Sequence, residues 1–163
     1  MKIIGIDPGL SGAIAILENN KVLNLFDMPV MSEGKKNKKQ LNSSHLVNII
    51  KENINQKEEI AVVVEQVNAM PGQGVTSMFN FGQTFGAIKG LCAALELPIY
   101  FVRPSKWKKH FELINSSKDA SRTKVIEMYP KLSNQLTKKK DVNKSDAILI
   151  ARYFSETRLS EEI

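Results

Sequence analysis

The sequence predicts an α/β domain with a mixed sheet, and three observations lead to that prediction. Three short apolar runs near the N-terminus, separated by turn residues, indicate three consecutive antiparallel strands. A continuous β-branched run at 60–65 indicates a strand that is covered on both faces. Helical patterns dominate the rest of the chain, so the predicted order βββαβαβα is that of a sheet with helices packed on it.

The first three strands are predicted at residues 2–7, 12–17 and 21–29. Asn19 and Asn20 between the second and third runs are a turn signal, so we expect an antiparallel meander. Each run is mostly apolar, which is typical of strands that line a core.

A polar, lysine-rich stretch follows at 32–40, and we expect it to form a mobile loop. Ser43 and Ser44 offer N-caps for a helix that extends to Ile54 with the apolar spacing of a 3.6-residue period. The strand at 60–65 comes next, and its unbroken apolar character places it centrally in the sheet.

Helices and one more strand complete the domain. We predict a helix over 77–95, a strand over 98–102, and helices starting near 105, over 120–128 and over 144–154. The first of these helices carries Gly82, Gly86 and Gly90 on one face, which permits close packing against a sheet or another helix; a glycine inside a helix otherwise costs about 1 kcal/mol. With 163 residues and 42% hydrophobic content, we expect residues 1–163 to form a single domain.

The composition argues against several classes of protein. No stretch approaches the roughly 18 apolar residues of a membrane span, and the N-terminus lacks the layout of a signal peptide. Cys92 is the only cysteine and lies among apolar residues, so we expect a buried thiol and no internal disulfide. His45 and His110 share no ligand spacing with Cys92, which argues against zinc. We therefore expect a soluble, cytoplasmic protein without a membrane partner.

Positive charge is concentrated in lysine clusters, and the net charge is +6 with a pI near 9.4. Clustered lysines in polar loops are the electrostatic footprint of a polyanion such as nucleic acid. Any single cluster is equally consistent with a solvated loop. The clusters are Lys35, Lys36, Lys38 and Lys39; Lys106, Lys108 and Lys109; and Lys138, Lys139 and Lys140.

Three acidic residues stand beside apolar elements in distant parts of the chain. Asp7 ends the first predicted strand, Glu65 ends the strand at 60–65, and Asp146 precedes the apolar run 147–151. An ionised carboxylate in such a place loses solvation unless a cation compensates for it. Three such acids form the oxygen-ligand set that hard divalent cations need.

Two of these acids, taken singly, could also serve a purely structural or a nucleotide-binding role. Asp7 precedes a Pro-Gly turn, and the Asp-x-Gly-x-x-Gly pattern that it begins also occurs in the phosphate-binding hairpins of actin-like and sugar-kinase-type phosphotransferases. Asp146 is equally suited to the first turn of a helix. A fourth candidate, Asp141, would lie about 140° from Asp146 on one continuous helix. It could reach the same site only from a preceding loop, and it could also be a solvated surface charge.

The residues around the three acids are Gly5-Ile6-Asp7-Pro8-Gly9, Val64-Glu65-Gln66-Val67 and Ser145-Asp146-Ala147. In combination they resemble the RuvC-type Holliday-junction resolvases of the ribonuclease H-like superfamily. The segments 70–82 and 102–108 resemble the resolvase-like proteins of phages and some bacteria. The resemblance covers nearly the whole chain, and it implies a ribonuclease H-like mixed five-stranded sheet flanked by helices.

The resemblance also implies a metal-dependent endonuclease that cleaves branched DNA, usually as a homodimer, with two Mg²⁺ or Mn²⁺ ions. Asp7, Glu65 and Asp146 match the family's catalytic acids and are the predicted catalytic and metal-binding residues, with Asp141 as the candidate fourth. Bacterial resolvases usually carry a further acid three residues before the last one, where this chain has Asn143. The fourth ligand is therefore Asp141, Asn143 or water.

The DNA backbone is expected to contact lysines near these acids, namely Lys106, Lys108, Lys109 and Lys118. Bacterial resolvases place an aromatic residue that probes the junction centre where this chain has Asn68; Met70 or Phe79 could take that role or belong to the core. Trp107 is expected to pack in the core rather than on an unpaired base. Two alternatives remain: a junction-binding protein with weak or no cleavage, and a phosphotransferase, which would normally need a second such domain.

Overall fold

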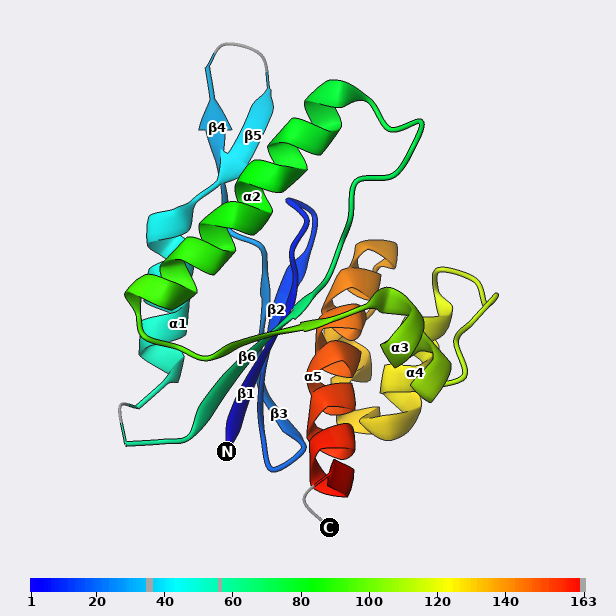
Figure 1. The fold of residues 1–163 in the computed structure, drawn as a ribbon. Helices are drawn as coiled ribbons and strands as arrows, with labels where there is room; N and C mark the ends of the chain where they lie inside the picture. Colours follow the sequence, from blue (N-terminus) through cyan, green and yellow to red (C-terminus); the bar gives the residue numbers. More distant parts are fainter. Residues whose placement is uncertain (35–36, 56, 162–163) are drawn as a thin grey trace.

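A mixed five-stranded sheet forms the centre of the computed structural model, which describes residues 1–34, 37–55 and 57–161 (Figure 1). The strand order is β3-β2-β1-β6-β7. The strands are β1 (Lys2–Asp7), β2 (Ala13–Glu18), β3 (Lys21–Asp27), β6 (Ile60–Glu65) and β7 (Ile99–Val102). β1, β2 and β3 pair antiparallel, whereas β6 is parallel to β1 and β7 is parallel to β6. The predicted meander and mixed sheet are confirmed.

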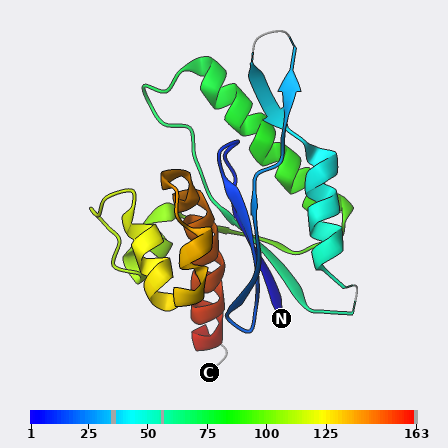
Figure 2. The same ribbon diagram turned by 180° about the vertical axis from the view of Figure 1, so that it is seen from behind.

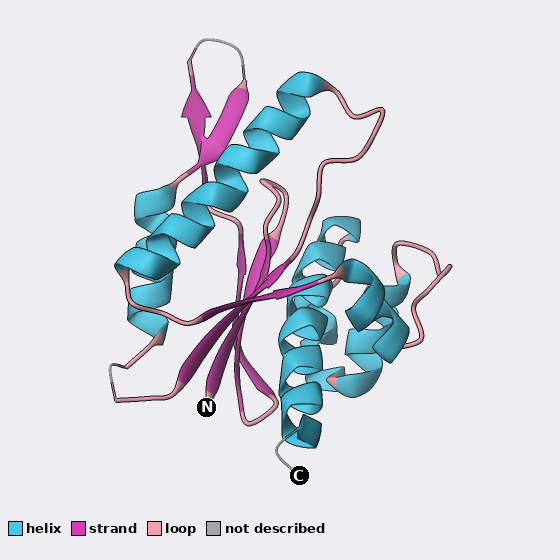
Figure 3. Ribbon diagram, in the orientation of Figure 1, coloured by secondary structure: helices cyan, strands magenta, loops and turns pink. Residues whose placement is uncertain are grey.

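Helices cover both faces of this sheet, as Figures 2 and 3 show from opposite sides. One face carries α1 (Ser43–Asn53) and α2 (Val75–Ala94); the other carries α3 (Pro104–His110), α4 (Ala120–Met128) and α5 (Val142–Glu161). Two short 3₁₀ helices, η1 (Pro130–Gln135) and η2 (Lys139–Asp141), connect α4 to α5. No helix in the described ranges is long and apolar enough to cross a membrane.

Strand β1 contributes to two hydrophobic cores because its side chains alternate between the two faces of the sheet. Ile4 and Ile6 pack toward α1 and α2, and Ile3 packs toward α5. Gly5 lies directly beneath α5, where an added Cβ would collide with the carbonyl oxygen of Ala147. The backbone of α5 therefore rests on β1, and this close approach sets the position of the start of α5 relative to the end of β1.

The stretch at 32–40 was predicted as a mobile loop, and for the described residues that prediction is wrong. Strands β4 (Val30–Glu33) and β5 (Lys38–Leu41) form an antiparallel hairpin instead, while residues 35–36 lie outside the described residues. The hairpin is anchored at its base, where Val30 pairs with Leu41 and the Leu41 side chain enters the core. This anchoring compensates for a composition that lacks the usual strand residues.

The cap of α1 and the bounds of α5 differ from the prediction, and α2 starts at Val75 rather than at 77. Asn42, rather than Ser43 or Ser44, caps α1, because its side-chain oxygen accepts a hydrogen bond of 3.0 Å from the backbone N–H of His45. Helix α5 starts two residues earlier than predicted and extends beyond 154 to Glu161.

The glycine face of α2 does not pack against the rest of the described chain. Apart from the neighbouring backbone of α2 itself, no atom of the described residues lies within 4 Å of a Cβ added at Gly82, Gly86 or Gly90, so the expected close intramolecular approach is wrong. The helix packs instead through a different face, which includes Ile88 and Cys92. Cys92 is buried as predicted, and burial raises the pKa of its thiol to about 11.

Candidate active site

Three of the predicted acids come together at one end of the central sheet. Asp7 is the last residue of β1, and Glu65 is the last residue of β6, its parallel neighbour. Asp146 lies near the start of α5, the helix that rests on β1. The three carboxylates are close enough for the negative charges of Glu65 and Asp146 to raise the pKa of Asp7.

Burial makes these negative charges costly. Desolvation, followed by repulsion from Glu65 and Asp146, raises the pKa of Asp7 to about 7. Desolvation also raises the pKa of Asp146 to about 6 and raises the pKa of Glu65. Within the described part of the chain, none of the three forms an ion pair with a lysine or arginine. Among the described residues, the positive charge of Lys108 lowers the pKa of all three acids but does not outweigh the cost of burial.

Each carboxylate is held by a donor that carries no charge. The indole Nε1–H of Trp107 donates to Oε2 of Glu65 at 2.7 Å. The hydroxyl of Ser121 donates to Asp146, and the backbone N–H of Gly9 donates to Asp7. Neutral donors orient a carboxylate without cancelling its charge, so the negative charge stays available to a cation.

The donor chemistry fits a hard divalent cation. In the residues that the structure describes, no group of three or more Asp, Glu, His or Cys side chains is arranged so that it could hold a metal ion. Mg²⁺ does not require such a group, because it usually binds through one or two carboxylates together with water and substrate phosphates. Three uncompensated carboxylates at one end of the sheet supply the oxygen ligands and the charge for such binding.

Asp141 and Asn143 have structural contacts of their own. One carboxylate oxygen of Asp141 accepts from the backbone N–H of Lys138 at 2.7 Å, and the other lies 3.4 Å from Nζ of Lys144. Asn143 donates its side-chain N–H to the backbone oxygen of Ser11 at 2.6 Å, which ties the β1–β2 turn to α5. The structure does not bring Asp141 into the group of three acids, and the identity of a fourth ligand stays a prediction.

We expect Asp141→Asn to lower the free energy of unfolding by about 1 kcal/mol and to leave the Mg²⁺ requirement for cleavage unchanged. The reason is that Asp141, which is 3% exposed, completes the capping box at the start of η2. Urea unfolding measures the first quantity, and cleavage rates over a range of Mg²⁺ concentrations measure the second. A variant of normal stability that needs several-fold more Mg²⁺ would identify Asp141 as a ligand.

The glycines of the Asp-x-Gly-x-x-Gly pattern shape the turn between β1 and β2. The backbone N–H of Gly12 donates to the oxygen of Gly9 at 2.9 Å, and a Cβ at Gly12 would collide with the backbone oxygen of Asp7. The pattern is therefore required by a tight turn, and it does not by itself indicate nucleotide binding.

A pocket of about 300 Å³ opens beside Asp146. Lys108 and Lys118 line it, together with Ser121 and Asn143. The charge of Lys108 lowers the pKa of all three acids, although desolvation outweighs it.

Of the four lysines predicted to contact DNA, the structure thus brings Lys108 and Lys118 to the pocket beside the acids. The other two, Lys106 and Lys109, are exposed on α3 outside this pocket, and their contact with DNA stays a prediction.

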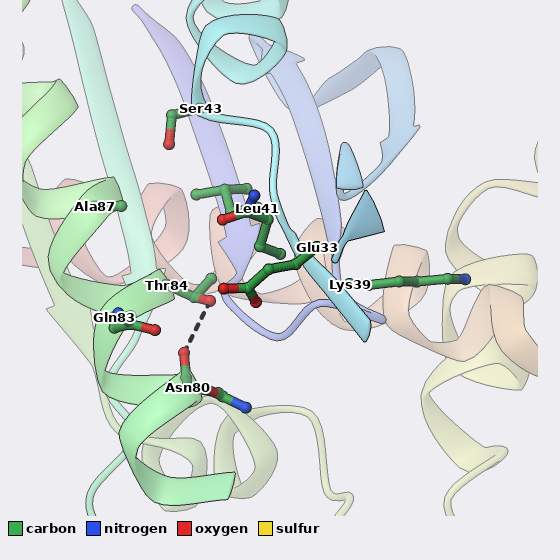
Figure 4. A pocket seen from close by; sticks show the side chains of 9 residues that line it. Glu33, Lys39, Leu41, Ser43, Asn80, Gln83, Thr84 and Ala87 are labelled. Carbon is green, nitrogen blue, oxygen red and sulfur yellow. Dashed lines mark hydrogen bonds between the residues drawn. The ribbon is translucent and has the colours of Figure 1, made fainter. Parts of the chain in front are cut away.

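A second pocket, of about 160 Å³, lies apart from the acids, between the β4–β5 hairpin and α2 (Figure 4). Glu33 points toward α2, whereas Lys39 points away from it. On the helix side, Thr84 donates to the backbone oxygen of Asn80 at 3.1 Å. The residues that line this pocket include none of the predicted catalytic acids, so it is not part of the candidate active site.

Sequence reasoning missed two residues of the site, Trp107 and Ser121. Trp107 packs in the core as predicted and is 1% exposed, which rules out stacking on a DNA base in this conformation. Its bond to Glu65 had no sequence signal, because 42 residues separate the two. Met70 and Phe79 are 60% and 66% exposed, so the alternative that they belong to the core is wrong.

Comparisons with known proteins agree with this geometry. Residues 3–153 match the model of the RuvC family, described as crossover junction endodeoxyribonuclease RuvC. The structure of T. thermophilus RuvC in complex with a Holliday junction substrate has a TM-score of 0.64 at 15% identity, with 96% of each chain covered. A second Thermus thermophilus RuvC structure has a TM-score of 0.56 at 17% identity, with 97% of each chain covered. No curated protein matches the sequence significantly.

These likenesses confirm the predicted ribonuclease H-like fold. The family model spans nearly all of the chain, from the first strand into the last helix. It includes Asp7, Glu65 and Asp146 together with the elements that carry them. The chain therefore belongs to the RuvC family of crossover junction endodeoxyribonucleases.

Proposed function

We propose that this protein is a metal-dependent endonuclease that cleaves branched DNA, with four-way junctions as its substrate. The observation that carries the proposal is the group of three uncompensated carboxylates at the ends of β1 and β6 and the start of α5. Membership in the RuvC family supports it, as does the fold shared with a RuvC protein bound to a Holliday junction.

Asp7, Glu65 and Asp146 would hold one or two Mg²⁺ ions, or Mn²⁺ in their place. Asp7 is the best candidate for a shared ligand, because the charges of both other acids act on it. When bound, the cations would supply the Lewis acidity that activates water and stabilises the leaving oxygen. Trp107, Ser121 and the backbone of Gly9 fix the carboxylates in orientation.

Lys108 and Lys118 would bind the DNA backbone beside the acids. Three carboxylates alone repel phosphate, so cations must line the approach to them, and both lysines line the pocket next to Asp146. Contacts of this kind position the phosphates without reading the bases. Lys106 and Lys109 would extend the same basic surface along α3.

We expect the double variant Lys108→Ala/Lys118→Ala to bind a four-way junction about tenfold more weakly. In a plot of the logarithm of the binding constant against the logarithm of the salt concentration, we expect the slope to be smaller in magnitude by about 2. The double variant Lys51→Ala/Lys57→Ala removes the same charge from exposed positions at the end of α1 and in the loop that follows it, and it serves as the matched control. Binding isotherms over a range of salt concentrations measure both effects. An equal loss of junction affinity in the two double variants would show that binding depends only on the net charge of the protein and not on the position of these lysines.

Symmetric cleavage of a four-way junction needs two active sites, so we propose that the protein acts as a homodimer. The exposed face of α2 is the surface that suits this role. Val75 and Phe79 on this helix are 81% and 66% exposed, and the face with the three glycines has open space around it. Apolar exposure of this kind is typical of a protein interface.

The test of the proposal is to incubate the protein with a labelled four-way junction, or with a linear duplex of the same sequence, in Mg²⁺, Mn²⁺ or EDTA. We expect paired nicks on opposing strands of the junction, only with metal and not in the duplex. Absence of metal-dependent nicking would overturn the proposal. Junction binding without nicking would favour a binding protein, the one alternative that Asn143, as a neutral residue tied to Ser11, supports.

A further inference from the structure

We propose that Trp107 is a positioning residue for Glu65: its indole N–H holds one carboxylate oxygen, so that only the other is presented to a divalent cation. The inference rests on the proposed function, since it concerns the same site. Its basis is the 2.7 Å hydrogen bond from Nε1 of Trp107 to Oε2 of Glu65, made by a side chain that is 1% exposed.

The fold brings these two residues together through the pairing of neighbouring strands. Glu65, at the end of β6, pairs with Val102, the last residue of β7. Helix α3 begins two residues later with Pro104, and its first turn directs Trp107 back toward the sheet. Because the indole is packed in the core, it cannot follow the carboxylate if Glu65 moves. The hydrogen bond therefore restrains Glu65.

An indole is well suited to this task. Its N–H is a donor that neither accepts nor ionises, so it fills one position on the carboxylate and leaves the negative charge in place. A lysine or arginine at the same position would neutralise Glu65 and compete with the cation. A glutamate side chain also loses up to about 2 kcal/mol of rotamer freedom when it is fixed, and a preformed restraint removes part of that cost from cation binding.

The ring of Trp107 also contacts Lys108, a lysine that lines the pocket beside the acids. Nζ of Lys108 lies 5.3 Å from the centroid of the Trp107 ring, within the range of a cation–π interaction. Trp107 thus contacts Glu65 through its N–H and Lys108 through its ring. These two contacts are separable, because phenylalanine keeps an aromatic face and lacks the N–H.

The test compares Trp107→Phe with Phe111→Leu. Both variants reduce a side chain of the same core cluster, since Phe111 is 6% exposed and lies directly after α3, but only the first removes the donor to Glu65. We expect Trp107→Phe to bind Mn²⁺ about tenfold more weakly in calorimetry and to need about tenfold more Mg²⁺ for half-maximal cleavage. Phe111→Leu should keep the wild-type affinity for Mn²⁺ and the wild-type Mg²⁺ concentration for half-maximal cleavage.

A second readout does not depend on activity. Trp107 is the only tryptophan in the chain, so all tryptophan fluorescence comes from the side chain that donates to Glu65. Mn²⁺ is paramagnetic and quenches a nearby indole. We expect Mn²⁺ to quench the wild-type emission along the calorimetric binding curve, and we expect Glu65→Gln to shift that curve at least about tenfold to higher Mn²⁺.

The outcomes separate this inference from the proposed function. Normal metal-dependent cleavage with wild-type Mn²⁺ affinity in Trp107→Phe would overturn the positioning role and leave the endonuclease intact. Equal weakening in Trp107→Phe and Phe111→Leu would overturn it as well, because the effect would then be loss of core packing. A wild-type protein that binds no Mn²⁺ and cleaves no junction would overturn both.

Discussion

Replacing Asp7 with asparagine is expected to slow junction cleavage by about 10³-fold or more, a rise of at least about 4 kcal/mol in the activation barrier. Asparagine has nearly the same shape and can still accept the hydrogen bond from Gly9, but it brings no charge to the cation. Junction binding should persist or tighten, because one negative charge is removed from the path of the phosphates. Single-turnover cleavage and gel-shift titration measure the two quantities.

Asp27→Asn is the matched control for this experiment. Asp27 ends β3 at the same end of the sheet as Asp7, but it is exposed and lies within 4 Å of Lys140 and Lys144. Its loss should leave the cleavage rate unchanged. A rate for Asp7→Asn within tenfold of the wild-type rate would contradict the role assigned to Asp7.

Without divalent cations, the protein is expected to lose stability as the pH rises from about 4 to about 8. The folded-state pKa values of Asp7 and Asp146 are raised to about 7 and about 6, so these two groups bind more protons in this window in the folded protein than in the unfolded chain. Deprotonation therefore favours the unfolded state. Added Mg²⁺ should restore the lost stability at the upper end of the window, because it compensates the cost of burying these charges.

Comparing Asp7→Asn with the wild type separates the effect of Asp7 deprotonation on stability from the effects of all other titrating groups. Near pH 8 the metal-free variant should be more stable than the wild type by on the order of 2 kcal/mol, and near pH 4 the difference should disappear. Mg²⁺ should stabilise the wild type at pH 8 more than it stabilises the variant. Denaturant unfolding at several pH values measures these differences. A variant that is less stable than the wild type at pH 8 would contradict the description of Asp7 as an uncompensated buried charge.

If Asp7→Asn stabilises the metal-free protein, the charge of Asp7 serves the binding of a ligand rather than the stability of the fold. The fold keeps three repelling carboxylates together because the strands and α5 that carry them are fixed by the core, most directly at Gly5. On the proposed function, the three acids lower the stability locally and form a site that attracts cations.

The sequence was sufficient for the five-stranded sheet and for placing Asp7, Glu65 and Asp146 beside apolar elements, whereas their role in catalysis stays a prediction. The strands could be predicted because each is a short apolar run bounded by turn residues, such as Asn19 and Asn20, which both have positive φ. The acids could be predicted because Asp7 and Glu65 end buried strands, where an ionised group needs compensation. In both cases the signal is local, so it survives without knowledge of the tertiary structure.

The remaining features depend on contacts between residues that are distant in the sequence. The β4–β5 hairpin has the composition of a loop, and its pairing is anchored by the burial of Leu41 in a core built by other elements. Trp107 has the pattern of an ordinary core residue, and only the fold shows that its N–H meets Glu65. Asp141 precedes Asp146 closely enough in the sequence to reach the same site from a loop, but its cap on η2 becomes visible only in the structure.

The central claim is that Asp7, Glu65 and Asp146 form one shared site for divalent cations. Calorimetric titration with Mn²⁺ tests this claim most directly, using the wild type, Asp7→Asn, Glu65→Gln, Asp146→Asn and, as control, Asp141→Asn. We predict that each of the first three variants binds at least about tenfold more weakly, that the control binds like the wild type, and that wild-type binding near neutral pH releases protons. Wild-type Mn²⁺ affinity in Asp7→Asn would contradict the claim of a shared site.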